Sequence, residues 1–156
     1  MTKEELKEYG MKVTQANSTE LVVITYELAM GYIEEAENKI DNVTEFRTCI
    51  KKARAFIGEL ISALNMESVI SGELMRLYLF INRELQIADI RKDITDLPRI
   101  RGILEKLKKS FEEITGMDKN GPVMKNTQQV YAGLTYSRGS LNENMYNDNV
   151  VRGYTV

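Results

Sequence analysis

The sequence predicts an all-α fold, an antiparallel up-down four-helix bundle with a short N-terminal cap segment and an extended C-terminal tail. Apolar residues recur in steps of three and four through four long segments, which is the spacing of one face of a helix. Residues with helix-capping chemistry stand at the start of three of these segments. The connections are short, so that consecutive helices run antiparallel. We therefore expect one bundle domain over residues 1–116 and a polar tail over 117–156.

The helix expected at about 17–41 is the one around which the others are organised. Asn17 and Glu20 have the spacing of a capping box, which fixes its start. Its inner face carries Val22, Tyr26, Ala29, Ile33, Ala36 and Ile40. Further apolar residues lie off this face: Leu21, Val23, Ile24, Leu28 and Met30. A helix packed on one side does not need this surplus, so either further helices bury it or it binds a partner.

The next two helices are expected at about 43–66 and 69–91. Asn42 and Glu45 repeat the capping-box spacing before the first of them. The inner faces carry Phe46, Ile50, Ala53, Ile57, Leu60 and Leu64 in the first, and Ile70, Leu74, Leu77, Ile81, Leu85 and Ala88 in the second. The second face is flanked by Met75, Tyr78, Leu79, Phe80 and Ile87. The second helix again carries more apolar surface than one neighbour covers.

The fourth helix is expected at about 96–115, with Asp96 or Thr95 as its cap. Pro98 falls in its first turn, where the missing N–H costs nothing. Its inner face carries Leu97, Ile100, Leu104, Leu107, Phe111 and Ile114. Its opposite face is charged, so this helix has an ordinary solvated exterior.

Residues 1–16 form the expected cap segment, in which 2–13 make a short, weak helix broken at Gly10. Two interpretations are open. The segment is either a fixed cap packed over one end of the bundle or a movable lid over an apolar surface, displaced by a ligand. The lid residues are then Tyr9, Met11 and Val13.

The tail over 117–156 is rich in Tyr, Asn and Gly and poor in aliphatic residues, a composition that favours a flexible chain. A short helix is compatible with 122–132, closed by Gly133. Two roles are open for the tail. It is either a tether without fixed conformation, or a segment that occupies the partner groove of its own molecule or of a neighbour.

Composition excludes several classes of function. The formal net charge of −2 offers no basic excess for a nucleic acid or an anionic membrane, and no apolar run is long enough to span a bilayer. The chain has no histidine, which excludes Ser-His-Asp or Cys-His catalysis and zinc sites of Cys/His type. We therefore expect neither an enzyme, nor a cofactor, nor a metal site.

The expected location is the cytoplasm. The single cysteine, Cys49, cannot form an internal disulfide, which fits a reducing compartment. The N-terminal MTKEELKEYG is charged and lacks the apolar core of a signal peptide.

The segment 13–29, VTQANSTELVVITYELA, resembles the flagellin export chaperone family, FliS, whose members typically read V-x-T-A-S-P-E-E-L-V before an apolar pair. Further matches follow in the same order: IKKAR at 50–54, ELISALN at 59–65, Leu74 with Leu77-Tyr78, and Leu85 with Ala88-Asp89. The resemblance covers about residues 9–115. Glu27-Leu28 stands where the family has Asp-Gly, and the tryptophan usual near the end of the family's sequences is absent.

This resemblance implies a cytoplasmic chaperone that binds the disordered C-terminal segment of flagellin, prevents premature polymerisation and keeps it competent for flagellar type III secretion. Components of the export gate are possible further partners. The expected partner-binding residues are Leu21, Ile24, Leu28, Met75, Tyr78 and Leu79, although burial in the core is the simpler interpretation of each one alone. The alternative function is a helical-bundle adaptor or regulatory protein that binds another folded protein.

Overall fold

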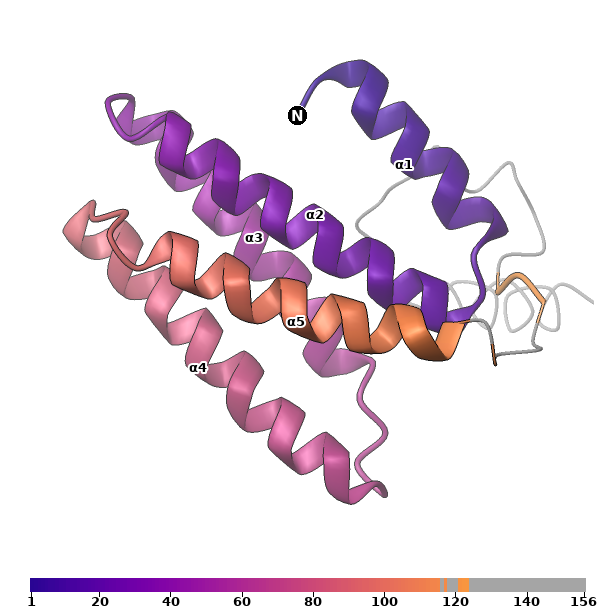
Figure 1. Cartoon of the computed structure of the whole chain (residues 1–156). Coiled ribbons are helices and arrows are strands. Elements are labelled where there is room, and N and C mark those ends of the chain that lie inside the picture. Colours follow the sequence, from indigo (N-terminus) through magenta and orange to yellow (C-terminus); the bar gives the residue numbers. More distant parts are fainter. Residues whose placement is uncertain (116, 118–120, 124–156) are drawn as a thin grey trace, which may run out of the picture.

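The computed structural model describes residues 1–115, 117 and 121–123. The helices in this part are α1 (Lys3–Gln15), α2 (Ser18–Asn38), α3 (Val43–Ser62), α4 (Val69–Arg91) and α5 (Leu97–Thr115). The all-α prediction is confirmed for the described residues, in which the four long helices expected are preceded by the helix expected in the cap segment (Figure 1). Most of the tail, including nearly all of the short helix expected at 122–132, lies outside the described residues.

α1 is one continuous helix, so the predicted break at Gly10 is wrong. Thr2 and Glu5 form a capping box at its start, in which the Glu5 N–H donates to the Thr2 hydroxyl at 3.2 Å. A glycine inside a helix costs about 1 kcal/mol relative to alanine, which a capped helix tolerates. The helix ends where Ala16 adopts an extended conformation.

The capping box predicted at the start of α2 is confirmed. The Glu20 N–H donates to the Asn17 side chain at 2.9 Å, and the Asn17 N–H donates to the Glu20 carboxylate at 2.8 Å. α2 ends at Asn38, three residues before the expected end, because the Lys39 N–H turns back to the Ala36 carbonyl at 3.0 Å.

At the start of α3, Asn42 caps the Glu45 N–H at 3.2 Å, as expected. The Glu45 carboxylate accepts from the Asn42 side chain instead of from its backbone, so the box is half formed. α3 ends at Ser62 instead of Met66, because the Leu64 N–H bonds to the Ile61 carbonyl in a tighter turn.

α2 is the central helix, and it packs against both α3 and α5, while α3 also packs against α4. Each helix from α2 to α5 runs opposite to the one before it (Figure 1). The side chains that fill the core come from all four of these helices. They are Tyr26 and Ile33 from α2; Phe46, Ile50 and Ile57 from α3; Tyr78, Ile81 and Leu85 from α4; and Leu97, Ile100 and Leu104 from α5. Each fully buried Ile or Leu contributes roughly 1.5 to 3 kcal/mol, so this core dominates stability.

Polar contacts between helices add to this packing. The Arg101 guanidinium of α5 lies 3.1 Å from the Glu37 carboxylate and 3.4 Å from that of Glu34, both on α2. The Arg54 guanidinium of α3 donates to the Asn82 side chain of α4 at 2.7 Å. Surface pairs contribute at most about 1 kcal/mol each, so these contacts align neighbouring helices more than they stabilise them.

α4 and α5 lie close only near the turn that connects them, and they diverge toward the other end of the bundle (Figure 1). The turn is set by Lys92, which has a left-handed backbone (φ 53°), and by the Asp93 N–H, which donates to the Ala88 carbonyl. At the divergent end, Ile70 is 69% exposed and Ile114 is 47% exposed. Their predicted inward positions are wrong, because the ends of the helices that carry them extend beyond the shared core.

Candidate functional site

An apolar face of α2 lies beneath α1, next to the main core. The cluster there contains Ala16, Leu21, Ile24 and Leu28, with Phe56 from α3 and Met1, Tyr9 and Val13 from the N-terminal segment. We call Leu21, Ile24 and Leu28 the covered face. The structure thus brings three expected partner-binding residues together with two expected lid residues. The third lid residue, Met11, is 61% exposed and lies outside the cluster.

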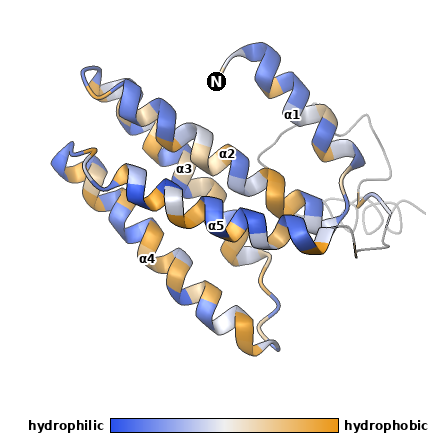
Figure 2. Cartoon of the chain, in the orientation of Figure 1, coloured by the Kyte–Doolittle hydropathy of each residue, from blue (hydrophilic) through white to orange (hydrophobic). Residues whose placement is uncertain are grey.

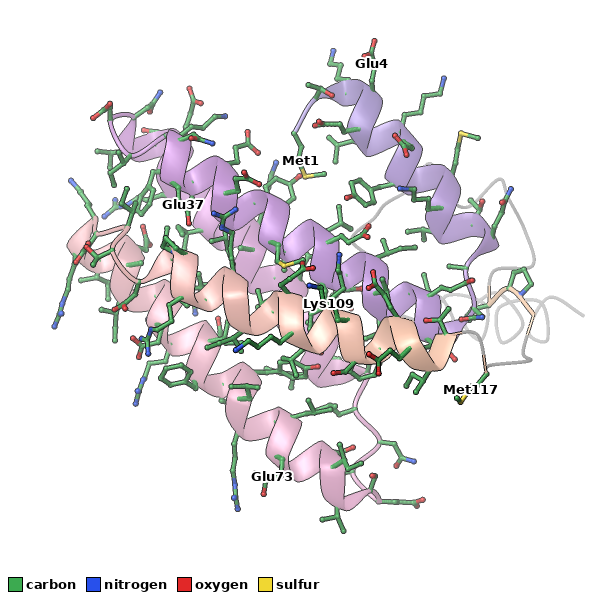
Figure 3. The ribbon with its side chains drawn as sticks, in the orientation of Figure 1. Met1, Glu4, Glu37, Glu73, Lys109 and Met117 are labelled. Atoms are coloured by element: carbon green, nitrogen blue, oxygen red, sulfur yellow. The ribbon has the colours of Figure 1, made fainter. Side chains whose placement is uncertain are left out.

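α1 covers this face but is loosely attached. Of the described helices it packs only against α2, and it has no fully buried residue. Met1 reaches from its start toward α2 (Figure 3), and the Met1 amino group donates to the Glu35 carboxylate at 2.7 Å. Burial, followed by the negative charge of the neighbouring Glu27 carboxylate, raises the pKa of Tyr9, so the hydroxyl stays protonated. These few contacts are of the kind that a competing ligand can replace.

The other three expected partner-binding residues lie on α4, away from the covered face. Tyr78 is 1% exposed, and its hydroxyl hydrogen-bonds to that of Tyr26 in the core. Met75 is half-buried, whereas Leu79 is 53% exposed. Of these three residues, Met75 and Leu79 therefore present surface in this conformation, whereas Tyr78 belongs to the core.

Leu79 lines a shallow hollow of about 340 Å³ together with Arg76, Phe80 and Arg83. The Arg83 and Arg99 guanidinium groups lie over the Phe80 ring, at 5.7 and 5.8 Å from its centre. The floor of this hollow is therefore apolar and its rim is cationic. Sequence reasoning included Leu79 but missed Arg99, which comes from the next helix, and also missed Arg76 and Arg83, which lie within about one turn of Leu79 on α4.

A second apolar surface was missed altogether. At the divergent end of α4 and α5, the start of α4 is apolar (Figure 2), and the inner-face residues there are only partly covered. We call this surface the open end, made of Ile70, Leu74, Leu77, Leu107, Phe111 and Ile114. Helical periodicity assigned all six to the core, because it reports which face is apolar and not whether a neighbour covers it.

A comparison with protein-family models matches residues 3–119 to the family described as flagellar protein FliS. This match spans all five helices and most of the chain. The chain belongs to the FliS family. A comparison with curated protein sequences finds no match.

FliS membership implies a flagellar secretion chaperone whose general partner is flagellin. The FliS family is a family of chaperones and not of enzymes. In the described part of the chain, no group of three or more acidic, Cys or His side chains is placed to hold a metal ion. Burial raises the pKa of the Cys49 thiol, and the Glu35 carboxylate adds to this, so the thiol stays protonated and unreactive. None of the described helices is long and apolar enough to cross a membrane.

The FliS match also includes α1, the helix over the covered face. It stops at residue 119, so most of the tail is outside it. The covered face, the hollow at Leu79 and the open end all lie within the matched range.

Proposed function

We propose that this FliS-family chain is a cytoplasmic export chaperone that binds the disordered C-terminal segment of flagellin. Binding prevents premature polymerisation and keeps flagellin competent for flagellar type III secretion. The observation that carries the proposal is the covered face, where Ile24 and Leu28 are buried and Leu21 is partly buried beneath a helix that has no buried residue of its own. An apolar surface with a removable cover is suited to a reversible apolar ligand.

The ordering cost falls on the ligand and not on this chain. A disordered segment that folds on binding spends about 2 to 5 kcal/mol on ordering, which leaves a moderate and reversible affinity. The helices that carry the covered face are held by the core, so the receiving surface is largely preformed. Reversibility matters because the chaperone must release flagellin for export.

α1 is the proposed lid. When it moves, Tyr9 and Val13 leave the covered face, and the contact between Met1 and Glu35 is lost. An apolar flagellin side chain that takes their place recovers the burial of the same α2 residues. The lid therefore excludes water from the covered face in the free chaperone, and this slightly lowers the affinity for flagellin because the lid must first open.

Met75 and Leu79 form a proposed second contact on α4, beside the hollow with the cationic rim. An extended flagellin segment gains roughly 3.3 to 3.6 Å per residue, which suits it to bridge two separate places on the chaperone. The open end adds a third apolar surface along α4. Such wrapping distributes the contacts over the outside of the bundle instead of concentrating them in one pocket.

Titration of the full-length chain with a synthetic flagellin C-terminal peptide tests the proposal. Calorimetry should show saturable 1:1 binding, and circular dichroism should show helix gained beyond the sum of the separate components. A scrambled peptide of the same composition is the control. Absence of saturable binding would refute the proposal, and binding of a folded partner without helix gain would favour the adaptor function.

A further inference from the structure

A second hollow, of about 550 Å³, lies where α1, α2 and α5 come together. Its apolar lining comes from Ala16, Val23 and Ile24, and the last of these also belongs to the covered face. This volume is in the range of pockets that accept a few side chains.

The lining of this hollow is acidic. Glu20, Glu27 and Glu112 contribute three carboxylates, against the single ammonium group of Lys12. Lys108 stands beside it and pairs with Glu112 at 3.5 Å. The hollow therefore suits a segment that combines apolar side chains with positive charge.

The chain after α5 returns to this hollow. The Val123 N–H donates to the Ala16 carbonyl at 3.1 Å, and Ala16 is itself one of the lining residues. The segment that begins at residue 124 therefore starts beside the hollow. Seven residues span at most about 25 Å, so Val130 and Tyr131 are within reach of it.

The sequence of residues 124–142, MKNTQQVYAGLTYSRGSLN, has the complementary chemistry. It contains Lys125 and Arg138 and no acidic residue. Its apolar residues are Met124, Val130, Tyr131, Leu134, Tyr136 and Leu141. The acidic residues of the tail lie outside this segment, with Asp118 before it and Glu143 and Asp148 after it.

We infer that residues 124–142 occupy the hollow between α1, α2 and α5 of their own molecule, with Val130 and Tyr131 against Val23 and Ile24. Because Ile24 belongs to both the hollow and the covered face, the docked segment competes with the flagellin segment. This regulatory consequence rests on the proposed function. The docking itself does not.

Photo-cross-linking of the full-length chain tests the docking. A benzoyl-phenylalanine at position 131 should cross-link within one chain to the segments of α1, α2 and α5 that line the hollow. The control carries the same group at position 154, beyond the docked segment, and should give at least about fivefold less of these products. Products that map to α4, form only between chains, or do not exceed those of the control would overturn the inference.

Charge reversal gives a second, independent measurement. Amide hydrogen exchange of residues 124–142 should be slower than that of an unstructured chain, and Glu112→Lys should reduce this protection by about fivefold, the effect of losing one surface ion pair. Glu113→Lys is the matched control, because Glu113 is also exposed on α5 but does not line the hollow. Equal protection in both variants would count against the docked segment.

Neither measurement involves flagellin, so failure of the proposed function leaves both results interpretable. In a separate titration, Glu112→Lys should bind the flagellin peptide about three- to fivefold more tightly than Glu113→Lys. If the docking is confirmed but the two variants bind the peptide with equal affinity, the docked segment does not compete with flagellin. The docking itself would still stand.

Discussion

The hydroxyl groups of Tyr26 on α2 and Tyr78 on α4 hydrogen-bond to each other in the core, across two helices whose backbones do not pack together. The centre of the Tyr26 ring lies 5.7 Å from the centre of the Phe111 ring of α5. It lies 6.3 Å from the centre of the Tyr78 ring. The three rings join α2, α4 and α5. They therefore hold α4 to the bundle in the region where α4 and α5 diverge.

Removal of one hydroxyl from this pair should destabilise the fold. Tyr78→Phe leaves the buried Tyr26 hydroxyl without its partner, so we expect a loss of about 1 to 3 kcal/mol in the free energy of unfolding. The double variant Tyr26→Phe with Tyr78→Phe removes both polar groups and should recover part of this loss. Urea unfolding of the three variants and the wild type measures the coupling. Strictly additive losses would show that the two hydroxyls act independently.

Weakening the lid should strengthen partner binding. Tyr9→Ala removes the ring that packs on the covered face, and we expect the flagellin peptide to bind about fivefold more tightly, since opening then costs roughly 1 kcal/mol less. Met11→Ala is the control, because Met11 is exposed on the same helix. Calorimetric titration compares the two. Equal affinity in Tyr9→Ala and Met11→Ala would show that α1 is a fixed cap.

The α4 contact is tested by a charge placed on its surface. Leu79→Glu should weaken flagellin-peptide binding at least about tenfold, because a carboxylate then replaces an apolar contact. The free energy of unfolding should change by less than about 0.5 kcal/mol, since Leu79 is largely exposed. Ile90→Glu, the same kind of change at another exposed position of α4, should leave affinity unchanged. Similar affinities for both variants would exclude Leu79 from the binding surface.

The attachment of the N-terminal segment should depend on pH. Burial acts to raise the pKa of Glu35, but hydrogen bonds from Lys39 and the Met1 amino group outweigh it and hold the pKa below its ordinary value. A lowered pKa adds stability above the ordinary value of about 4.3, and this stability disappears as the pH falls through the folded-state pKa.

Urea unfolding at pH 6 and pH 3 measures this effect. Glu35→Gln should be less stable than the wild type at pH 6, by up to about 1 kcal/mol, and the difference should be smaller at pH 3. Glu4→Gln is the control, because Glu4 points into solvent at the start of α1 (Figure 3). A difference for Glu35→Gln that is equally large at pH 3 and pH 6 would assign its effect to packing instead of charge.

Part of the candidate site followed from the sequence because it depends on local pattern. Leu21, Ile24 and Leu28 exceed what one packed face of α2 needs, and this excess marked them as a surface for something else. The lid hypothesis named Tyr9, Met11 and Val13, of which Tyr9 and Val13 lie against this face and Met11 is exposed. Tyr78 was not distinguished from its exposed neighbour Leu79, because a flanking position on a helix becomes core or surface according to which helix lies opposite.

The sequence by itself determined the all-α class, the capping box of Asn17 and Glu20 and the inner faces of the central helices, since these depend on residues within one or two turns of each other. The tertiary structure alone decided that α4 diverges from α5, that Ile70 and Ile114 are exposed, and that Arg99 joins Phe80 from another helix. These features depend on the angles at which helices cross and on how far each extends past its neighbour. Such angles result from the packing of all side chains together, and no local spacing records them.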